Sequence, residues 1–570
     1  MKTIYYNGAV YTGEMPLCQA FAVENGIFTF AGTDEQALAG LGEREVCEGI
    51  WDEGEQREGE CGQGKGVPGR DVQGESIRTV DLQGRFVCAG FNDSHMHLLN
   101  YGSSLQMANL AEHTGTMEEV TACLKHFLKE RQLPPGAWLK GRGWNQDYFQ
   151  GEKCFPNRYD LDLVSTEHPI CISRACGHIC AVNSAALRLA GITRDTVQPE
   201  GGRIDTDESG EPLGILRENA MDLVFGKMPA PTVQEIKEMI LAASRALNRY
   251  GITSCQTDDF LALGNVSWRE VMTAYLELEK EGELSVRVNE QSQFTCLQEL
   301  KQFVEEGYCT GWGSGRFRIG PLKMLGDGSL GARTAYLSKP YSDDQSTRGI
   351  PVFTRAQFGE MIGYARNHGM QAAIHAIGDG ILDQVLGVYE EVLRENPRAD
   401  HRHGVVHCQI TRPDQLEKFK ELDLHAYVQS IFLDYDIHIV EERVGKGRAA
   451  SSYNFKTLMD LGVTVSNGSD CPVEQPDVMA GIQCAVTRLT LDGSMGPYLP
   501  DQAMTVREAI DSFTKAGAWA SFEEEKKGAV RPGMIADFVV LEKNPFETPL
   551  DELAGIGVRE VFVGGECVHR

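Results

Sequence analysis

The 570-residue sequence is poor in basic residues and has neither a Cys-x-x-Cys pair nor a long apolar run. It contains 54 Lys and Arg against 82 Asp and Glu, which gives a formal net charge of −28. Because phosphate groups and anionic lipids need a clustered excess of positive charge, this balance argues against nucleic acid and membranes as partners. We interpret the negative charge as a contribution to solubility rather than as a sign of a cationic substrate.

The 16 cysteines are scattered along the chain, and no two have the spacing of a zinc ribbon or a thiol redox site. The N-terminus has no apolar segment of signal-peptide length and starts directly with strand-like alternation. No stretch approaches the roughly 20 apolar residues that a membrane-spanning helix needs. We therefore expect reduced, mostly buried thiols and a cytoplasmic protein.

Residues 1–89 and 529–570 both contain short alternating apolar runs separated by turn residues. In the first part, Asn25-Gly26 stands between two such runs, which predicts a β-hairpin. We expect the two parts to form one small β-sandwich domain beside the main fold. Residues 48–76 are rich in Gly, Glu and Gln and contain few apolar residues, so they predict a polar, flexible insertion without an assigned role.

Residues 90–528 alternate between strand-like and helical patterns, and the number of strands indicates the fold. We identify eight strands, at residues 86–91, 251–256, 285–290, 317–325, 370–376, 403–408, 424–429 and 463–470. Amphipathic helical segments separate most neighbours, so we predict an α/β fold of the (β/α)8 TIM-barrel type. The first connection, at about residues 100–245, is far longer than one crossover needs and predicts a lid or subdomain.

In a barrel of this type, reactive groups lie at the C-terminal ends of the strands. Side chains alternate along an extended segment, so the imidazoles of His95 and His97, which follow the first strand, lie on the same side. Imidazole nitrogen suits zinc and similar ions, and a carboxylate can both bind the ion and take a proton from water. The candidate ligands are His95, His97, Lys323, His375, His407 and Asp470. Together they predict one or two divalent metal ions, with zinc as the expected ion, that activate water.

Each of these residues also has a structural interpretation. A single buried His is usually structural, Lys323 alone fits an ion pair, and Asp470 alone fits a helix cap. The conjunction of ligand types at five strand ends favours the metal site. Since an ammonium group beside a dication is repulsive, we hypothesise that Lys323 carries a carbamate whose oxygens bridge two ions.

The sequence around these residues resembles the amidohydrolase superfamily, and within it the amidohydrolase-3 or YtcJ-like group. The resemblance covers nearly the whole chain except the polar insertion. Its most specific segments are Gly90–His97, Lys323–Gly331, His375–Asp379, His407–Gln409 and Gly468–Val473. One departure is Val406, which stands where relatives tend to have Glu and puts the hydrogen bonding near the second metal in question.

The resemblance implies a role for each candidate ligand. His95 and His97 would bind one metal ion, and His375 and His407 would bind a second. Carbamylated Lys323 would bridge the two ions. Asp470 would be both a ligand and the catalytic proton carrier.

The resemblance also implies hydrolysis of C–N bonds in small molecules, amides and N-substituted formamides among them. Hydrolysis of a lactone, cyclic amide or carbamate is an alternative reaction, and an inactive metal-binding barrel is an alternative from another class. Retention of Asp470 argues against the inactive barrel. Trp144, His178 and Arg333 are candidate substrate contacts, with purely structural roles as equal alternatives. The family further suggests a homodimer.

Overall fold

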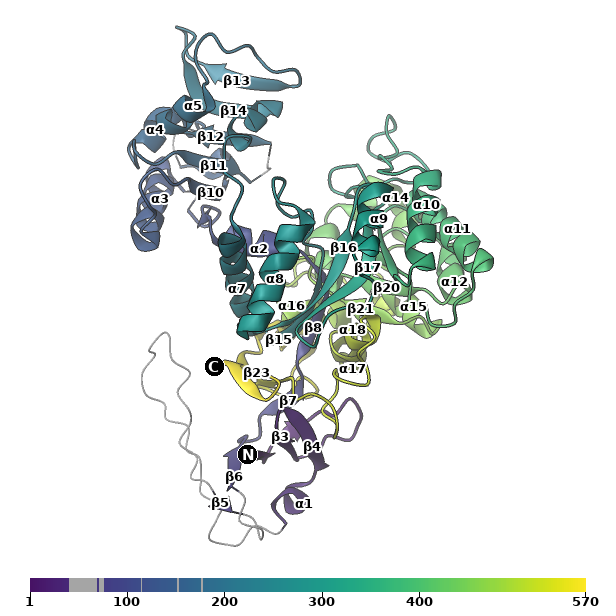
Figure 1. The fold of residues 1–570 in the computed structure, drawn as a ribbon. Helices are drawn as coiled ribbons and strands as arrows, with labels where there is room; N and C mark the ends of the chain where they lie inside the picture. The colour runs from purple at the N-terminus through teal and green to yellow at the C-terminus, as the bar shows by residue number, and fades with distance from the viewer. Residues whose placement is uncertain (40–68, 71–75, 114, 151–152, 176–177) are drawn as a thin grey trace. The chain divides into compact units, whose positions relative to one another are not determined.

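The structure is a computed structural model that describes residues 1–39, 69–70, 76–113, 115–150, 153–175 and 178–570. The described chain forms two compact units (Figure 1), of which one comprises residues 1–98 and 243–570 and the other residues 99–242. The predicted long insertion at about 100–245 covers nearly the same residues as the second unit. Most of the predicted polar insertion at 48–76 lies outside the described residues.

Eight parallel strands form the barrel of the first unit. In sheet order they are β21 (Val465–Asn467), β20 (His425–Val428), β19 (Gly404–His407), β18 (Ala372–Ala376), β17 (Phe317–Leu325), β16 (Arg287–Gln293), β15 (Ile252–Thr257) and β8 (Phe91–Met96). The sheet nearly closes, because Asp470 N donates to His95 O and His97 N donates to Cys471 O, both at 2.8 Å. The predicted eight-stranded parallel barrel is therefore present, and its closing contacts lie at the C-terminal ends of the strands.

Helices connect most of the consecutive barrel strands. They include α8 (Trp268–Glu281), α9 (Leu297–Glu305), α10 (Arg355–Asn367), α11 (Asp379–Glu395), α12 (Pro413–Glu421) and α15 (Phe455–Asp460). In α10, Thr354 caps the first turn in a capping box with Gln357, and Phe358, Ile362 and Ala365 are buried along one face. The helical periodicity that predicts these segments thus reflects packing against the barrel.

The predicted first strand at residues 86–91 was wrong in its bounds. Phe86–Ala89 is β7, which pairs with β2 (Ala9–Val10) and β22 (Phe538–Leu541) in another sheet. The barrel strand β8 begins only after Gly90, where a Cβ would lie 2.2 Å from a Thr253 carbon. The prediction failed because the apolar run crosses from one sheet to the next, while β8 itself is mostly polar.

Strands from both chain ends form two further sheets. One has the order β4-β3-β1-β6-β5, and its strands are β4 (Ile27–Gly32), β3 (Ala20–Glu24), β1 (Lys2–Tyr6), β6 (Ser76–Asp81) and β5 (Gly69–Arg70). The other has the order β2-β7-β22-β23-β24, where β23 is Val558–Val563 and β24 is Glu566–His569. The hairpin predicted at Asn25-Gly26 is confirmed, and both turn residues have positive φ. Phe21 and Phe28 of the first sheet share a hydrophobic cluster with Phe538 and Phe562 of the second.

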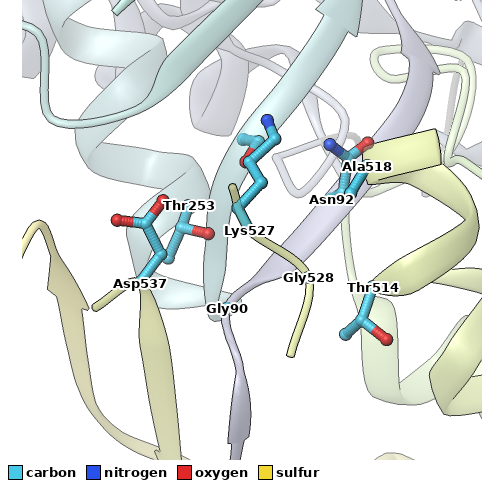
Figure 2. Close-up of a pocket in the computed structure, with 9 residues that line it drawn as sticks. Gly90, Asn92, Thr253, Thr514, Ala518, Lys527, Gly528 and Asp537 are labelled. Atoms are coloured by element: carbon cyan, nitrogen blue, oxygen red, sulfur yellow. The ribbon is translucent and has the colours of Figure 1, made fainter. Parts of the chain in front are cut away.

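A polar seam joins the N-terminal end of the barrel to the second of these sheets. Arg287 at the start of β16 donates from Nε to Asp537 Oδ2 at 2.6 Å and from Nη2 to Asp537 Oδ1 at 3.0 Å. Figure 2 shows Asp537 and Lys527 near Gly90, where the chain passes from β7 to β8. The Arg287–Asp537 pair therefore links this end of the barrel to the sheet, opposite the strand ends that carry the candidate ligands.

The second unit has its own six-stranded sheet and its own core. The sheet order is β13 (Gly202–Thr206), β14 (Pro212–Glu218), β12 (Ile179–Val182), β11 (Ile170–Arg174), β10 (Leu139–Trp144) and β9 (Ala108–Asn109). Helix α3 (Met117–Arg131) packs Val120 and Leu124 against this sheet. In neither unit does the described chain contain a helix with the length and apolar character needed to cross a membrane.

Candidate metal centre

The six residues predicted as metal ligands all meet at the C-terminal ends of the barrel strands. The ring centroids of His95 and His97 are 5.3 Å apart, and those of His95 and His407 are 5.6 Å apart. His375 is 4.4 Å from His407 by the same measure. The structure therefore brings together side chains that the sequence separates by hundreds of residues.

In the part of the chain that the structure describes, two groups of three side chains have their ligand atoms within 4.8 Å of one another. They are His95, His407 and Asp470, and His95, His97 and Asp258. Asp470 Oδ1 lies 3.4 Å from His95 Nε2 and 2.9 Å from His97 Nε2. Imidazole nitrogens and carboxylate oxygens in a buried pocket are a donor set that fits zinc or a similar divalent cation.

His375 belongs to neither of these groups. Its Nε2 lies 3.2 Å from Gly328 O and 3.3 Å from Asp327 Oδ1. Asp327 is itself held by the backbone amides of Ile377 and Gly378. His375 thus borders the centre with Nε2 turned toward Asp327 and Gly328, which leaves Nδ1 as the nitrogen open to a ligand.

Asp258 is a candidate that the sequence prediction missed. It follows β15, contacts His97 Nδ1 through Oδ1 and accepts a hydrogen bond from Lys323 Nζ at 2.8 Å through Oδ2. The sequence contained the information needed to predict this residue, because the second predicted strand is followed directly by Thr257-Asp258-Asp259. The rule used for the other strand ends applies equally to this one.

Two glutamines orient the buried imidazoles. Gln291 Oε1 lies 2.8 Å from His95 Nδ1, and Gln429 Oε1 lies 2.7 Å from His407 Nδ1. Since an amide oxygen accepts only, each Nδ1 carries the proton and each Nε2 is left as a ligand nitrogen. Val406, the departure from the family pattern, instead packs with Ala373, Tyr427 and Ala520 in the barrel interior.

Asp93 ties together the two strand ends that carry His95 and Asp470. Its Oδ1 accepts from His95 N at 3.2 Å and from Ser469 N at 3.1 Å. Burial raises the pKa of Asp93 to about 7. His407 and Asp470 have φ values of 80° and 59°, a conformation that costs energy in residues other than glycine. The surrounding contacts hold these two side chains in place despite that cost.

Burial and neighbouring charges give the imidazoles opposite proton affinities. Burial, together with Lys323, lowers the pKa of His95 to about 3. Burial also disfavours charge on His97, but Asp258 and Asp470 outweigh it and raise its pKa to about 10. Burial disfavours charge on Asp470 as well, yet the neighbouring His97, His407 and His95 keep its pKa below the usual range. The Asp470 carboxylate is therefore ionised at neutral pH and can bind a cation.

The three candidate substrate-binding residues form contacts with residues outside the cluster of candidate ligands. Trp144 is fully buried in the core of the second unit and donates from Nε1 to Ile172 O at 3.1 Å, which favours a packing role. His178, also in that unit, is exposed and pairs with Glu218 at 3.0 Å. Arg333, in the first unit, pairs with Asp343 at 2.6 Å. A substrate role for any of the three stays a prediction.

The model of the Amidohydrolase family matches residues 78–569. The YtcJ protein of Bacillus subtilis (strain 168) is 31% identical over 100% of this chain and 99% of its own length. The N-substituted formamide deformylase of Arthrobacter pascens is 25% identical over 85% of this chain and 89% of its own length. Among solved structures, an uncharacterized metal-dependent hydrolase from Pyrococcus horikoshii has a TM-score of 0.75 and 28% identity, over 97% of this chain and 99% of the other.

Proposed function

Because the chain belongs to the amidohydrolase family, in its YtcJ-like group, and is a metal-dependent hydrolase, we propose that it cleaves an amide-type C–N bond in a small molecule. N-substituted formamides are included in this substrate class, as the similarity to the Arthrobacter pascens deformylase suggests. The observation that carries the proposal is the convergence of the imidazoles of His95, His97 and His407 on the carboxylate of Asp470. That arrangement supplies ligands and a proton acceptor in one place.

We propose that the site binds zinc, as one ion or as two. One ion would be held by His95 together with either His407 and Asp470 or His97 and Asp258, because the single free nitrogen of His95 binds one ion at a time. In the second arrangement, His375 and His407 would be left to hold another ion. When bound, such an ion would supply Lewis acidity and lower the pKa of a water molecule. The proposed carbamate on Lys323 would convert the fully buried ammonium group beside Asp258 into a further pair of oxygen ligands. Intact mass spectrometry under native conditions tests this modification, since the carbamate adds the mass of one carbon dioxide.

The protein's own groups account for the proton transfers. Asp470 takes the proton of the attacking water at a carboxylate oxygen and then delivers it to the leaving nitrogen, so one group acts first as base and then as acid. The C–O bond forms, the C–N bond breaks, and the products are a carboxylate and an amine. His95 and His407, fixed by Gln291 and Gln429, keep their Nε2 atoms directed at the reacting centre.

Elemental analysis combined with a substrate panel tests this function. Zinc-loaded protein should hydrolyse members of a panel of N-formyl and N-acyl amines, and Asp470→Asn should lower kcat by about 100-fold or more. Activity confined to lactones, cyclic amides or carbamates would replace the proposed bond class. No activity on any compound would favour the inactive metal-binding barrel.

Three further proposals concern the whole protein. We propose that the two terminal sheets, with their shared cluster around Phe538, form one β-sandwich domain from residues 1–89 and 529–570, beside a barrel at 90–528. We also propose a cytoplasmic location. The homodimer suggested by the family is tested by light scattering of the purified protein.

A further inference from the structure

Acidic side chains beside the metal centre have no function in the reaction described above. They lie on the segments that follow β20 and β21, where η3 (Ser430–Phe432) leads into α13 (Leu433–Asp436). We call Asp434, Asp436 and Glu474 the acidic wall. Its position is fixed by two neighbours: the Phe432 ring stacks on the His407 ring at 5.9 Å and 15°, and Glu474 follows Asp470 by four residues.

Asp436 has a free acceptor atom in this wall. It is 8% exposed, and its Oδ2 accepts from Tyr453 Oη at 2.6 Å and from Gln409 Nε2 at 3.2 Å. In the part of the chain that the structure describes, its Oδ1 has no hydrogen-bond donor. The wall therefore keeps one carboxylate oxygen available.

Gln409 adds an independent observation that points to a ligand. It is 2% exposed, and its Oε1 has no hydrogen-bond partner among the described residues. Because the same amide group donates to Asp436, this unpartnered oxygen lies beside that member of the acidic wall. Buried acceptors without donors are rare in folded proteins, and a ligand rich in N–H groups would satisfy them.

Glu474 is the third acceptor, and the charges that act on it from the described residues of the metal-free protein are negative. Within the described residues it has no ion-pair or hydrogen-bond partner. The charges that act on it come from Asp434, Asp436 and Asp470. Burial and these three carboxylates raise the pKa of Glu474 to about 7. A bound cation would remove this repulsion and restore the ionised form.

The spacing of these groups indicates an organic cation rather than a metal ion. Among the described residues, ligand atoms converge within 4.8 Å in only two groups of three, and neither includes a member of the acidic wall. Acceptors spread over several loops suit an ammonium or guanidinium group, whose N–H donors point in different directions.

Resting on the proposed function, we propose that the acidic wall is a specificity subsite for a cationic group of the substrate. The preferred substrates are then N-acyl or N-formyl derivatives of amines that carry a second, positively charged nitrogen. The net charge of the chain did not indicate this preference. The placement of unpaired carboxylates next to His407 and Asp470 does.

A matched pair of substrates tests the subsite. N-formylcadaverine and N-formylhexylamine have the same length and differ only in the terminal ammonium group. In zinc-loaded wild-type protein, kcat/KM should be at least about tenfold higher for N-formylcadaverine. Glu474→Gln should reduce this ratio to near unity, and Glu474→Lys should invert it. Glu417→Gln, on the exposed side of α12, is the control and should keep the wild-type ratio.

The outcomes separate the subsite from the proposed function. Hydrolysis of both compounds with equal kcat/KM in wild type would overturn the subsite and leave the hydrolase function standing. If neither compound is hydrolysed, the full substrate panel decides the proposed function, and the intact formamides are titrated into the zinc-loaded protein by calorimetry. About tenfold tighter binding of N-formylcadaverine that is lost in Glu474→Gln would still support the subsite, and equal affinities would overturn it.

Discussion

Lys323 Nζ donates to Asp258 Oδ2 at 2.8 Å inside the barrel, and the two side chains are 0% and 1% exposed. The pair joins β17 to the end of β15 across 65 residues of sequence. A buried pair of this kind depends on both partners, because removal of one leaves the other charge without compensation. Asp258 therefore holds Lys323 in place as well as facing His97.

Asp258→Asn should weaken zinc binding by at least about tenfold, because the variant loses a charged ligand. Zinc affinity is measured by titration against a competing chelator. The control is Asp501→Asn, an exposed carboxylate of the same charge. Equal zinc affinity in Asp258→Asn and wild type would remove Asp258 from the ligand set.

Gln291→Leu should lower zinc affinity by about 10- to 100-fold, because His95 loses the acceptor that fixes its tautomer and ring orientation. Gln291→Glu keeps an acceptor at this position and should restore most of the affinity. Thermal unfolding of the metal-free variants shows whether they fold. If the Leu and Glu variants bind zinc equally well, the orienting role of Gln291 is wrong.

Zinc affinity should rise with pH. In the metal-free protein the pKa of His97 is raised to about 10, so its imidazole is protonated at neutral pH. Zinc must displace that proton, and its affinity should increase by up to about tenfold per pH unit between pH 7 and 9. Calorimetry in buffers of different ionisation enthalpy counts the released protons. His97→Gln should lose this pH dependence even though it binds more weakly.

Glu523→Gln should destabilise the protein at neutral pH by about 3 kcal/mol. Glu523 is 5% exposed and forms ion pairs with Arg318 and Lys527, both at 2.9 Å. Burial disfavours its charge, but Lys527 and Arg318 lower its pKa from 4.5 to about 2. The stabilisation is therefore fully present above pH 4.5 and is lost as the pH falls toward 2.

Chemical denaturation of the wild type and of Glu523→Gln across this pH range measures the difference. The difference in unfolding free energy should shrink steadily below pH 4.5. Glu525→Gln, an exposed carboxylate two residues away, should change stability by less than about 0.5 kcal/mol. A difference between wild type and Glu523→Gln that is independent of pH would contradict the ion-pair explanation.

Gly468→Ala should impair both stability and zinc binding. A Cβ at this position would lie 2.6 Å from His95 N and 2.7 Å from Asp93 Oδ1, so the strand ends that carry His95 and Asp470 would have to separate. Overpacking of this kind costs about 1–3 kcal/mol. Gly363→Ala, inside α10 with no atom within 4 Å of the added carbon, should instead stabilise by about 0.5–1 kcal/mol. Thermal unfolding and zinc titration compare the two.

By itself, the sequence determined the barrel and most of its metal centre. Eight strand-like runs with helical segments between them predict parallel strands, and all C-terminal ends of parallel strands meet at one mouth. His95, His407 and Asp470 could therefore be assigned to one site without any knowledge of distances. The periodicity of apolar residues sufficed because it reports which face of each element is buried.

Only the tertiary structure decided which side chains touch. The apolar run 86–91 is divided between two sheets, and Trp144 is buried in the core of the second unit. Asp258 contacts both His97 and Lys323. The tertiary structure also put Asp436 and Glu474 beside the metal centre without cationic partners. The periodicity of apolar residues indicates which side chains are buried, but it does not indicate which side chains contact one another. Those contacts depend on how the strands twist and close into a barrel.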